Sequence, residues 1–166
     1  EEGRARGIEI LTSYDRGGAW RWSASYVLSE AEDRIDGVWV PRTLDQRHAI
    51  GLNAAFRPSD SWQFSWTFQY HTGWPATASG FLTQALPGLT LVRARTVGEL
   101  NTLRLPAYHR LDFRASKNFN VGDGMLQVYL DIFNLYNRTN LRGYSFFPVV
   151  VNGRVTVRQA PGEEML

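Results

Sequence analysis

The histidine and cysteine residues decide whether this chain is suited to hold a metal ion. The sequence contains three histidines, His48, His71 and His109, and no cysteine, so thiolate ligands are absent. Metal ligands must converge on one point. The alternation of polar and apolar residues puts His48 and His109 on one face of a sheet and His71 on the other. We therefore predict no metal site.

Charged side chains recur at the polar positions of the same alternating segments. They are Glu9, Arg21, Arg47, Arg57, Arg110, Asp112, Arg114 and Asp131. One interpretation is a hydrated wall whose opposite charges pair across neighbouring strands; the other is a contact surface for an anionic ligand. Asp112 and Asp131 could face each other, but a carboxylate pair alone does not make a glycosidase, and the nearby arginines are charge partners. No serine–histidine–aspartate arrangement follows from the spacing, so we predict no catalytic residue and no cofactor.

Phosphate groups and nucleic acids are both disfavoured as ligands. The Gly122-Asp123-Gly124 segment lacks the Gly-x-x-x-x-Gly-Lys-Ser/Thr pattern and the helix that follows it, so we interpret it as a turn. The 18 Lys and Arg residues nearly balance 16 Asp and Glu, and the arginines are spread along the chain. This distribution argues against a nucleic-acid partner.

The elements that carry these residues are β-strands, and the clearest runs from Trp62 to Tyr70. Aromatic residues occupy every second position, namely Trp62, Phe64, Trp66, Phe68 and Tyr70. This alternation gives a strand with one apolar face and one polar face. Its length of about 26 Å matches strands that cross a membrane better than the shorter strands of soluble proteins. We expect lipid on its apolar side and water on its polar side.

Five further long strands are predicted, at about residues 4–12, 19–28, 46–57, 108–119 and 125–133. Short turns alternate with long segments, which we expect to be irregular over residues 29–45 and 73–107. Asn152-Gly153 predicts a small hairpin with a type I′ turn, and residues 161–164 show no strand pattern. The predicted fold is all-β: an antiparallel up-and-down meander of long strands, part of a transmembrane β-barrel. The short turns should face the periplasm and the long segments the outside.

Four segments at the strand ends resemble those of a known family. They are Asp45-Gln46-Arg47-His48, Gln69-Tyr70-His71-Thr72-Gly73-Trp74-Pro75, Tyr108-His109-Arg110-Leu111-Asp112-Phe113-Arg114 and Asp131-Ile132-Phe133-Asn134-Leu135-Tyr136-Asn137-Arg138-Thr139-Asn140. In this order and spacing, with Arg4-Ala5-Arg6-Gly7-Ile8-Glu9 before them, they resemble the C-terminal strands of TonB-dependent outer-membrane receptors. The resemblance covers about residues 4–145. It implies ligand import across the bacterial outer membrane, without a catalytic role.

The resemblance also implies partners that lie outside this sequence. The family has an N-terminal plug domain and an energy-coupling box, and its barrel usually ends on a strand with a terminal aromatic residue; none of these is found here. We therefore interpret residues 1–166 as the C-terminal part of a receptor barrel that lacks its plug domain, its earlier strands and its last strand. The expected partners are outer-membrane lipid, the receptor's own plug domain and remaining barrel strands, and the TonB complex. The plug would meet the charged residues of the polar face.

Ligand contacts are expected in the long segments, because binding residues concentrate on loops held by a rigid scaffold. The candidates are Trp39, Arg42, Trp74, Phe81, Arg93 and Arg95. Packing between loops would explain the same residues, so none is assigned to the ligand, which could be a siderophore, a vitamin, a saccharide or a peptide. Two alternatives stay open: a small stand-alone outer-membrane barrel, structural or enzymatic, and a soluble β-sandwich that binds carbohydrate. The sandwich requires a second sheet over the aromatic face.

Overall fold

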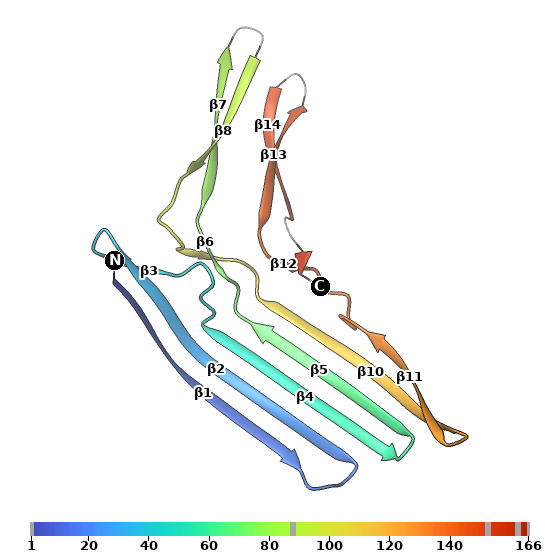
Figure 1. Cartoon of the computed structure of the whole chain (residues 1–166). Helices are drawn as coiled ribbons and strands as arrows, with labels where there is room; N and C mark the ends of the chain where they lie inside the picture. Colours follow the sequence, from blue (N-terminus) through green and yellow to red (C-terminus); the bar gives the residue numbers. More distant parts are fainter. Residues whose placement is uncertain (1, 87–88, 152–153, 162–163, 166) are drawn as a thin grey trace.

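The strands form one long antiparallel sheet with smaller hairpins at one end (Figure 1). The computed structural model describes residues 2–86, 89–151, 154–161 and 164–165. The main sheet has the order β1-β2-β4-β5-β10-β11, with β3 paired to the end of β2. Its strands are β1 (Glu2–Asp15), β2 (Trp20–Ile35), β3 (Val38–Pro41), β4 (His48–Ser59), β5 (Trp62–His71), β10 (Tyr108–Val121) and β11 (Gly124–Ile132). The predicted meander of long strands is confirmed.

Four further pairs of strands lie outside this sheet. They are β6 (Pro75–Ala76) with β9 (Leu103–Arg104), β7 (Ser79–Leu86) with β8 (Leu89–Thr96), β12 (Asn140–Leu141) with β15 (Glu164–Met165), and β13 (Tyr144–Val151) with β14 (Arg154–Pro161). The β7–β8 and β13–β14 hairpins both project from the end of the sheet that carries the long connections (Figure 1). The β13–β14 hairpin is the one predicted from the sequence, and its Asn152-Gly153 turn lies outside the described residues.

Three predictions of irregular structure were wrong. In residues 29–45, β2 continues to Ile35 and turns back into β3 through Asp36 and Gly37, whose φ angles of 49° and 82° suit a two-residue hairpin turn. In residues 73–107, β7 and β8 form a hairpin whose polar and apolar residues do not alternate clearly. Near the chain end, Glu164 of β15 pairs with Leu141. This partner is distant in the sequence, so no local pattern reveals it.

The second strand is longer than predicted because charged pairs continue its ladder with β1 beyond the apolar residues. Arg4 lies opposite Glu32 and Arg6 lies opposite Glu30. The guanidinium–carboxylate distance is 2.5 Å in each pair. Opposite charges at directly facing positions stabilise an antiparallel pair of strands, and hydrophobic alternation does not detect them.

The register places alternating residues of neighbouring strands on common faces. Trp66 of β5 lies opposite Phe113 of β10, with 5.5 Å between ring centroids, whereas Ser65 lies opposite Arg114. We call the first side the apolar face and the second the polar face. The apolar face includes Ile8, Ile10, Trp20, Trp22, Tyr26, Leu28, Ile50, Leu52, Phe56, Trp62, Phe64, Trp66, Phe68, Tyr70, Leu111, Phe113, Leu126, Val128, Leu130 and Ile132.

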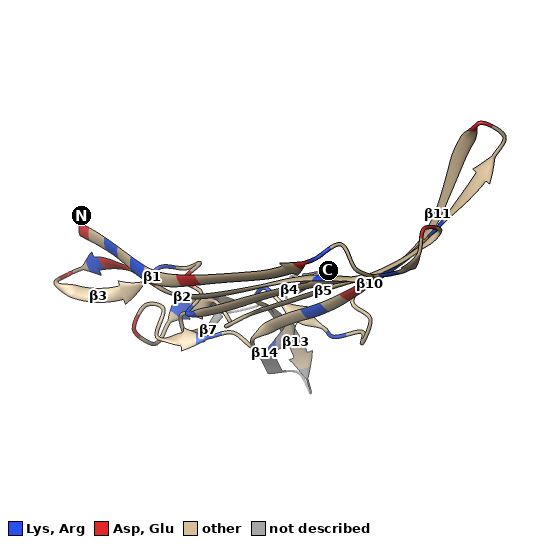
Figure 2. Cartoon of the chain, turned by 90° about the horizontal axis from the view of Figure 1, so that it is seen from below, with Lys and Arg blue, Asp and Glu red and all other residues tan. Residues whose placement is uncertain are grey.

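The main sheet is a single curved layer with open edges at β1 and β11 (Figure 2). Its large apolar side chains are exposed rather than covered by a second sheet: Trp20 and Trp22 are 50% and 43% exposed. Tyr108 is the only hydrophobic residue that is buried among the described ones. The cover that a soluble sandwich requires is therefore missing from the described residues, and an uncovered aromatic face suits contact with lipid.

No helix long and apolar enough to cross a membrane occurs among the described residues.

Candidate functional site

Arginine–carboxylate pairs occupy the middle of the polar face. Arg114 donates to Asp131 on the neighbouring strand, with Nε–Oδ1 and Nη2–Oδ2 distances of 2.5 and 2.7 Å. Arg110 donates through Nε and Nη2 to Oδ2 of Asp112 at 3.0 and 2.6 Å. The other oxygen of Asp112 accepts the backbone N–H of Asn134 at 2.9 Å. Each carboxylate thus has its own cation, and the two do not form a pair with each other.

Arg47 departs from the face that residue alternation assigns to it. Its Nη2 lies 2.8 Å from Oε1 of Glu30, which also pairs with Arg6 at 2.5 Å. Glu30 shares a face of β2 with Leu28, so the Arg47 guanidinium reaches the apolar side. The alternation fails because Arg47 precedes β4, where the strand ladder does not yet direct the side chain.

Glu9 lies within β1 on the polar face and is exposed.

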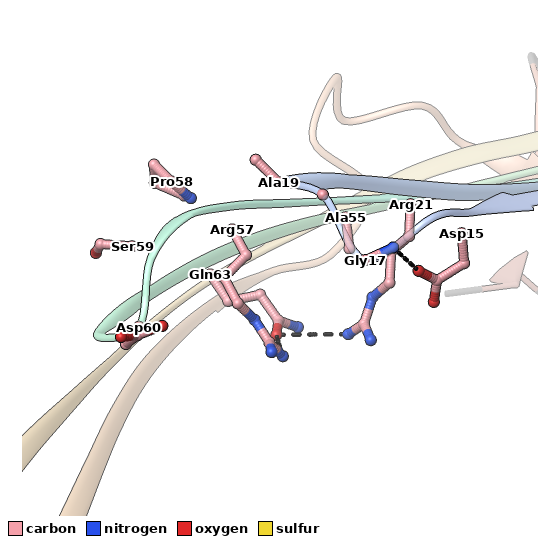
Figure 3. A pocket seen from close by; sticks show the side chains of 11 residues that line it. Asp15, Gly17, Ala19, Arg21, Ala55, Arg57, Pro58, Ser59, Asp60 and Gln63 are labelled. Carbon is pink, nitrogen blue, oxygen red and sulfur yellow. Dashed lines mark hydrogen bonds between the residues drawn. The ribbon is translucent and has the colours of Figure 1, made fainter.

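The charged residues nearest the short turns surround a hollow of about 450 Å³ (Figure 3). Nη2 of Arg57 donates to Oε1 of Gln63 at 2.8 Å, and Nη2 of Arg21 approaches the same oxygen at 3.5 Å. In the part of the chain that the structure describes, no ion pair joins either guanidinium to a carboxylate. Two carboxylates line the same hollow: Asp15, which lies opposite Arg21 in the β1–β2 ladder, and Asp60.

At the opposite end of the sheet, Asp45 joins three segments of the chain. Asp45 is 4% exposed, and its Oδ1 accepts the backbone N–H of Ala31 at 2.8 Å. Arg104 of β9 forms an ion pair with Oδ2 of Asp45 and donates to the carbonyl of Gly73 at 3.1 Å. The long connections that follow β2 and β5 are thus held to each other and to β2.

Three asparagines that were not among the candidate residues hold the other connections. Asn101 donates through Nδ2 to a backbone carbonyl of the preceding long connection at 2.7 Å. Asn134 exchanges hydrogen bonds with the backbone N–H and C=O of Arg138 at 3.0 and 2.8 Å. Asn140 is 1% exposed and bonds both the N–H and the C=O of His109 at 3.1 Å. Asn101 and Asn134 have φ angles of 56° and 52°, a conformation that asparagine tolerates better than most residues. Only Asn134 directly follows a strand predicted from the sequence, so the other two carried no such signal.

Two of the predicted loop candidates, Trp39 and Arg42, already have protein partners. The Trp39 ring lies under the guanidinium groups of Arg4 and Arg34, at 4.1 and 5.9 Å from its centroid. Arg42 lies 2.8 Å from Asp33, and this hydrogen bond raises the pKa of the Arg42 guanidinium. Trp39 therefore packs the β2–β3 hairpin against β1, and Arg42 binds the end of the hairpin to β2, as expected if both serve packing between loops.

The candidates on the β7–β8 hairpin point to different sides. Phe81 packs on Phe146 of the β13–β14 hairpin, with 5.1 Å between ring centroids. Arg93 and Arg95 lie opposite Leu82 and Gly80, at positions that alternate with Phe81. The aromatic contact therefore joins the two hairpins, while the two arginines are exposed on the other face.

The three histidines and the last loop candidate, Trp74, lie in separate aromatic contacts. The ring partners are Tyr26 for His48, Tyr108 and Trp74 for His71, and Tyr136 for His109. Burial raises the pKa of Tyr136, so its hydroxyl stays protonated; it lies 2.7 Å from Nδ1 of His109. Among the described residues, no three His, Asp or Glu side chains gather in a way that could hold a metal ion.

Comparison with known proteins supports a single assignment. A sequence model of the family described as TonB dependent receptor-like, beta-barrel matches residues 1–135. No curated protein and no solved structure matches the chain. The matched residues contain all six long strands of the main sheet, with both of its faces. The chain belongs to the TonB-dependent receptor-like β-barrel family.

Proposed function

We propose that this chain forms part of the wall of a bacterial outer-membrane receptor that imports a ligand with energy supplied through the TonB complex. The two-sided sheet carries the proposal, because Trp66 and Ser65 are neighbours in sequence and lie on opposite faces. A wall between lipid and a hydrated passage needs this arrangement. The arginines and carboxylates of the polar face support a hydrated passage.

We further propose that residues 1–166 are the C-terminal part of a larger barrel. The sheet ends at β1 and at β11, and an open edge in lipid would leave backbone groups without hydrogen-bond partners. Plugged outer-membrane transporters use about 22 strands. Earlier strands of the receptor would pair with β1 and a later strand with β11. The six long strands of this sheet are fewer than the eight or so of the smallest single-chain barrels, which disfavours a stand-alone structural or enzymatic barrel.

Receptors of this family carry a plug domain, and we propose that such a plug fills the space beside the polar face. The ligand would meet the long connections and their hairpins first. Siderophores, vitamins, saccharides and peptides are the candidate ligand classes. The receptor would have no catalytic role.

Uptake assays test this function in cells that carry or lack the full-length receptor gene. Radiolabelled compounds from the four ligand classes are supplied with and without TonB. We expect accumulation of one class to require both the receptor and TonB. Accumulation that depends on neither, for all four classes, would contradict the proposed function. A difference in gel migration between the unheated and the heated receptor checks that the barrel has formed in every strain.

A further inference from the structure

In β1 and β2, the apolar face ends in charged residues on the side of the long connections. Ile8 lies opposite Leu28, and the next pair on the same face is Arg6 with Glu30. Charged residues gather at this end of β1 (Figure 2). We define the charged rim as the described charged residues that continue the apolar face here, namely Glu2, Arg4, Arg6, Glu30, Glu32, Arg34 and Arg47. The charged rim therefore borders the surface that contacts lipid.

The charged rim has an excess of positive charge. Among the described residues it contains four arginines and three glutamates. Arg6 and Arg47 both bind Glu30, at 2.5 and 2.8 Å, so one carboxylate serves two guanidinium groups. Asp45, which also acts electrostatically on Arg47, binds Arg104 instead. Because each guanidinium has five N–H donors, Arg6 and Arg47 keep donors that no carboxylate of the rim occupies.

The shared carboxylate lies beneath the guanidinium groups. The Glu30 side chain is 13% exposed, whereas those of Arg6 and Arg47 are 72% and 42% exposed. A hollow of about 310 Å³ lies here, and Ile8 and Leu28 line it together with these three residues. One part of its wall is aliphatic and another part carries N–H donors. A molecule with an anionic group next to a hydrocarbon chain matches both parts.

We propose that Arg6 and Arg47 bind a phosphate group of a lipid in the outer leaflet, whose acyl chains lie against Ile8 and Leu28. Guanidinium groups form charge-assisted, often bidentate hydrogen bonds with phosphate oxygens. Basic side chains next to the apolar surface of a membrane protein attract anionic headgroups. The aliphatic wall favours a lipid over a free phosphate ion, which has no apolar surface to bury. This inference rests on the proposed function, because the long connections must face the outside for the rim to meet the outer leaflet.

Lipid binding to the full-length receptor tests the site. The receptor is purified in a neutral detergent, and native mass spectrometry measures its occupancy by diphosphoryl lipid A, a phosphorylated lipid of the outer leaflet. We expect Arg6→Gln with Arg47→Gln to raise the lipid concentration at half occupancy about tenfold, since charge-assisted hydrogen bonds to phosphate are lost. Adding Glu30→Gln removes the carboxylate that this double variant leaves unpaired, and the increase should persist.

Three comparisons sharpen the result. Arg6→Lys with Arg47→Lys should restore part of the affinity, because lysine keeps the charge but not the bidentate geometry. Arg21→Gln with Arg57→Gln, on the polar face, should leave the affinity unchanged. Lipid A from which both phosphates have been removed should bind the receptor and its variants equally.

An unchanged concentration at half occupancy in the triple variant with Glu30→Gln would overturn the proposal. So would displacement of lipid A by inorganic phosphate at an equal concentration, because the site would then take the free ion. These outcomes count against the site when the receptor shifts in gel migration on heating and imports its ligand. An unmodified receptor that imports none of the tested ligand classes counts instead against the proposed function.

Discussion

The two ends of the sheet differ in how their chain connections are stabilised. Where the connections are long, buried polar side chains reach from one segment to another: Asp45 and Asn140 are 4% and 1% exposed and bind neighbouring backbone groups. Where the connections are short, the turns close on themselves. Gly17 adopts a φ of 72° and donates to Asp15 within the same turn.

The difference follows from the entropy of the connections. Ordering a long segment costs conformational entropy for every residue in it, so these segments need side chains such as Arg104 that bind them to the sheet. A tight turn has little freedom to lose. It therefore needs no side chain from a distant segment to hold it.

A charge placed on the apolar face at the middle of a strand, between the two ends of the sheet, should reduce the stability of the receptor most. Trp66→Arg puts a guanidinium on the apolar face at mid-strand and should destabilise the receptor by about 2–4 kcal/mol. Ser65→Arg places the same side chain on the polar face and should cost far less. Urea unfolding of the full-length receptor in phospholipid vesicles measures both. Equal losses would show that the apolar face does not contact lipid.

Removing the buried carboxylate at the long-connection end should have the next largest effect. Asp45→Ala leaves Arg104 without its carboxylate and the N–H of Ala31 without an acceptor, at a cost of about 2–3 kcal/mol. Asp60→Ala, beside a short turn, should change stability by about 0.5 kcal/mol or less. The same unfolding assay compares them, and a larger loss for Asp60→Ala would reverse the contrast between the ends.

A smaller effect is expected from two asparagines near opposite ends of the β10 ladder. Asn140→Ala removes the partner of both backbone groups of His109, at a cost of about 1–2 kcal/mol. Asn118 accepts a hydrogen bond from Nε2 of Gln127 at 3.0 Å, and Asn118→Ala should cost about 0.5 kcal/mol because water can replace this bond. Hydrogen exchange of the His109 amide provides a local check: it should quicken in the Asn140 variant alone. Slow exchange in that variant would show that Asn140 does not hold this strand end.

Single cysteines report which end faces the outside, with almost no effect on stability. Glu99→Cys lies in a long connection and Asp123→Cys in a short turn, and both positions are exposed. An impermeant maleimide added to whole cells should label the full-length receptor at residue 99 and not at residue 123. Labelling at residue 123 alone would invert the orientation assigned to the two ends.

The candidate site was only partly predictable. Alternation correctly placed Arg21, Arg57 and Arg114 on the polar face, because the side chains of a paired strand must point to alternate sides. It did not predict which arginines would have carboxylate partners. Arg114 meets Asp131 because they face each other on adjacent strands, whereas Arg57 reaches Gln63 from a bulge. Arg47 lies just before β4, and its guanidinium group lies on the apolar side, contrary to the alternation.

The sequence alone determined the long strands, their two faces and the short turns, since each depends on residues within about ten positions of one another. The tertiary structure decided what is held by distant partners: the pairing of β15 with β12, the hold of Arg104 on Asp45, and the contact of Phe81 with Phe146. These contacts join segments that are far apart in the sequence, so no local pattern predicts that they lie close together in space. Local residue patterns therefore describe the wall of the barrel, while the arrangement of its two ends follows only from the folded chain.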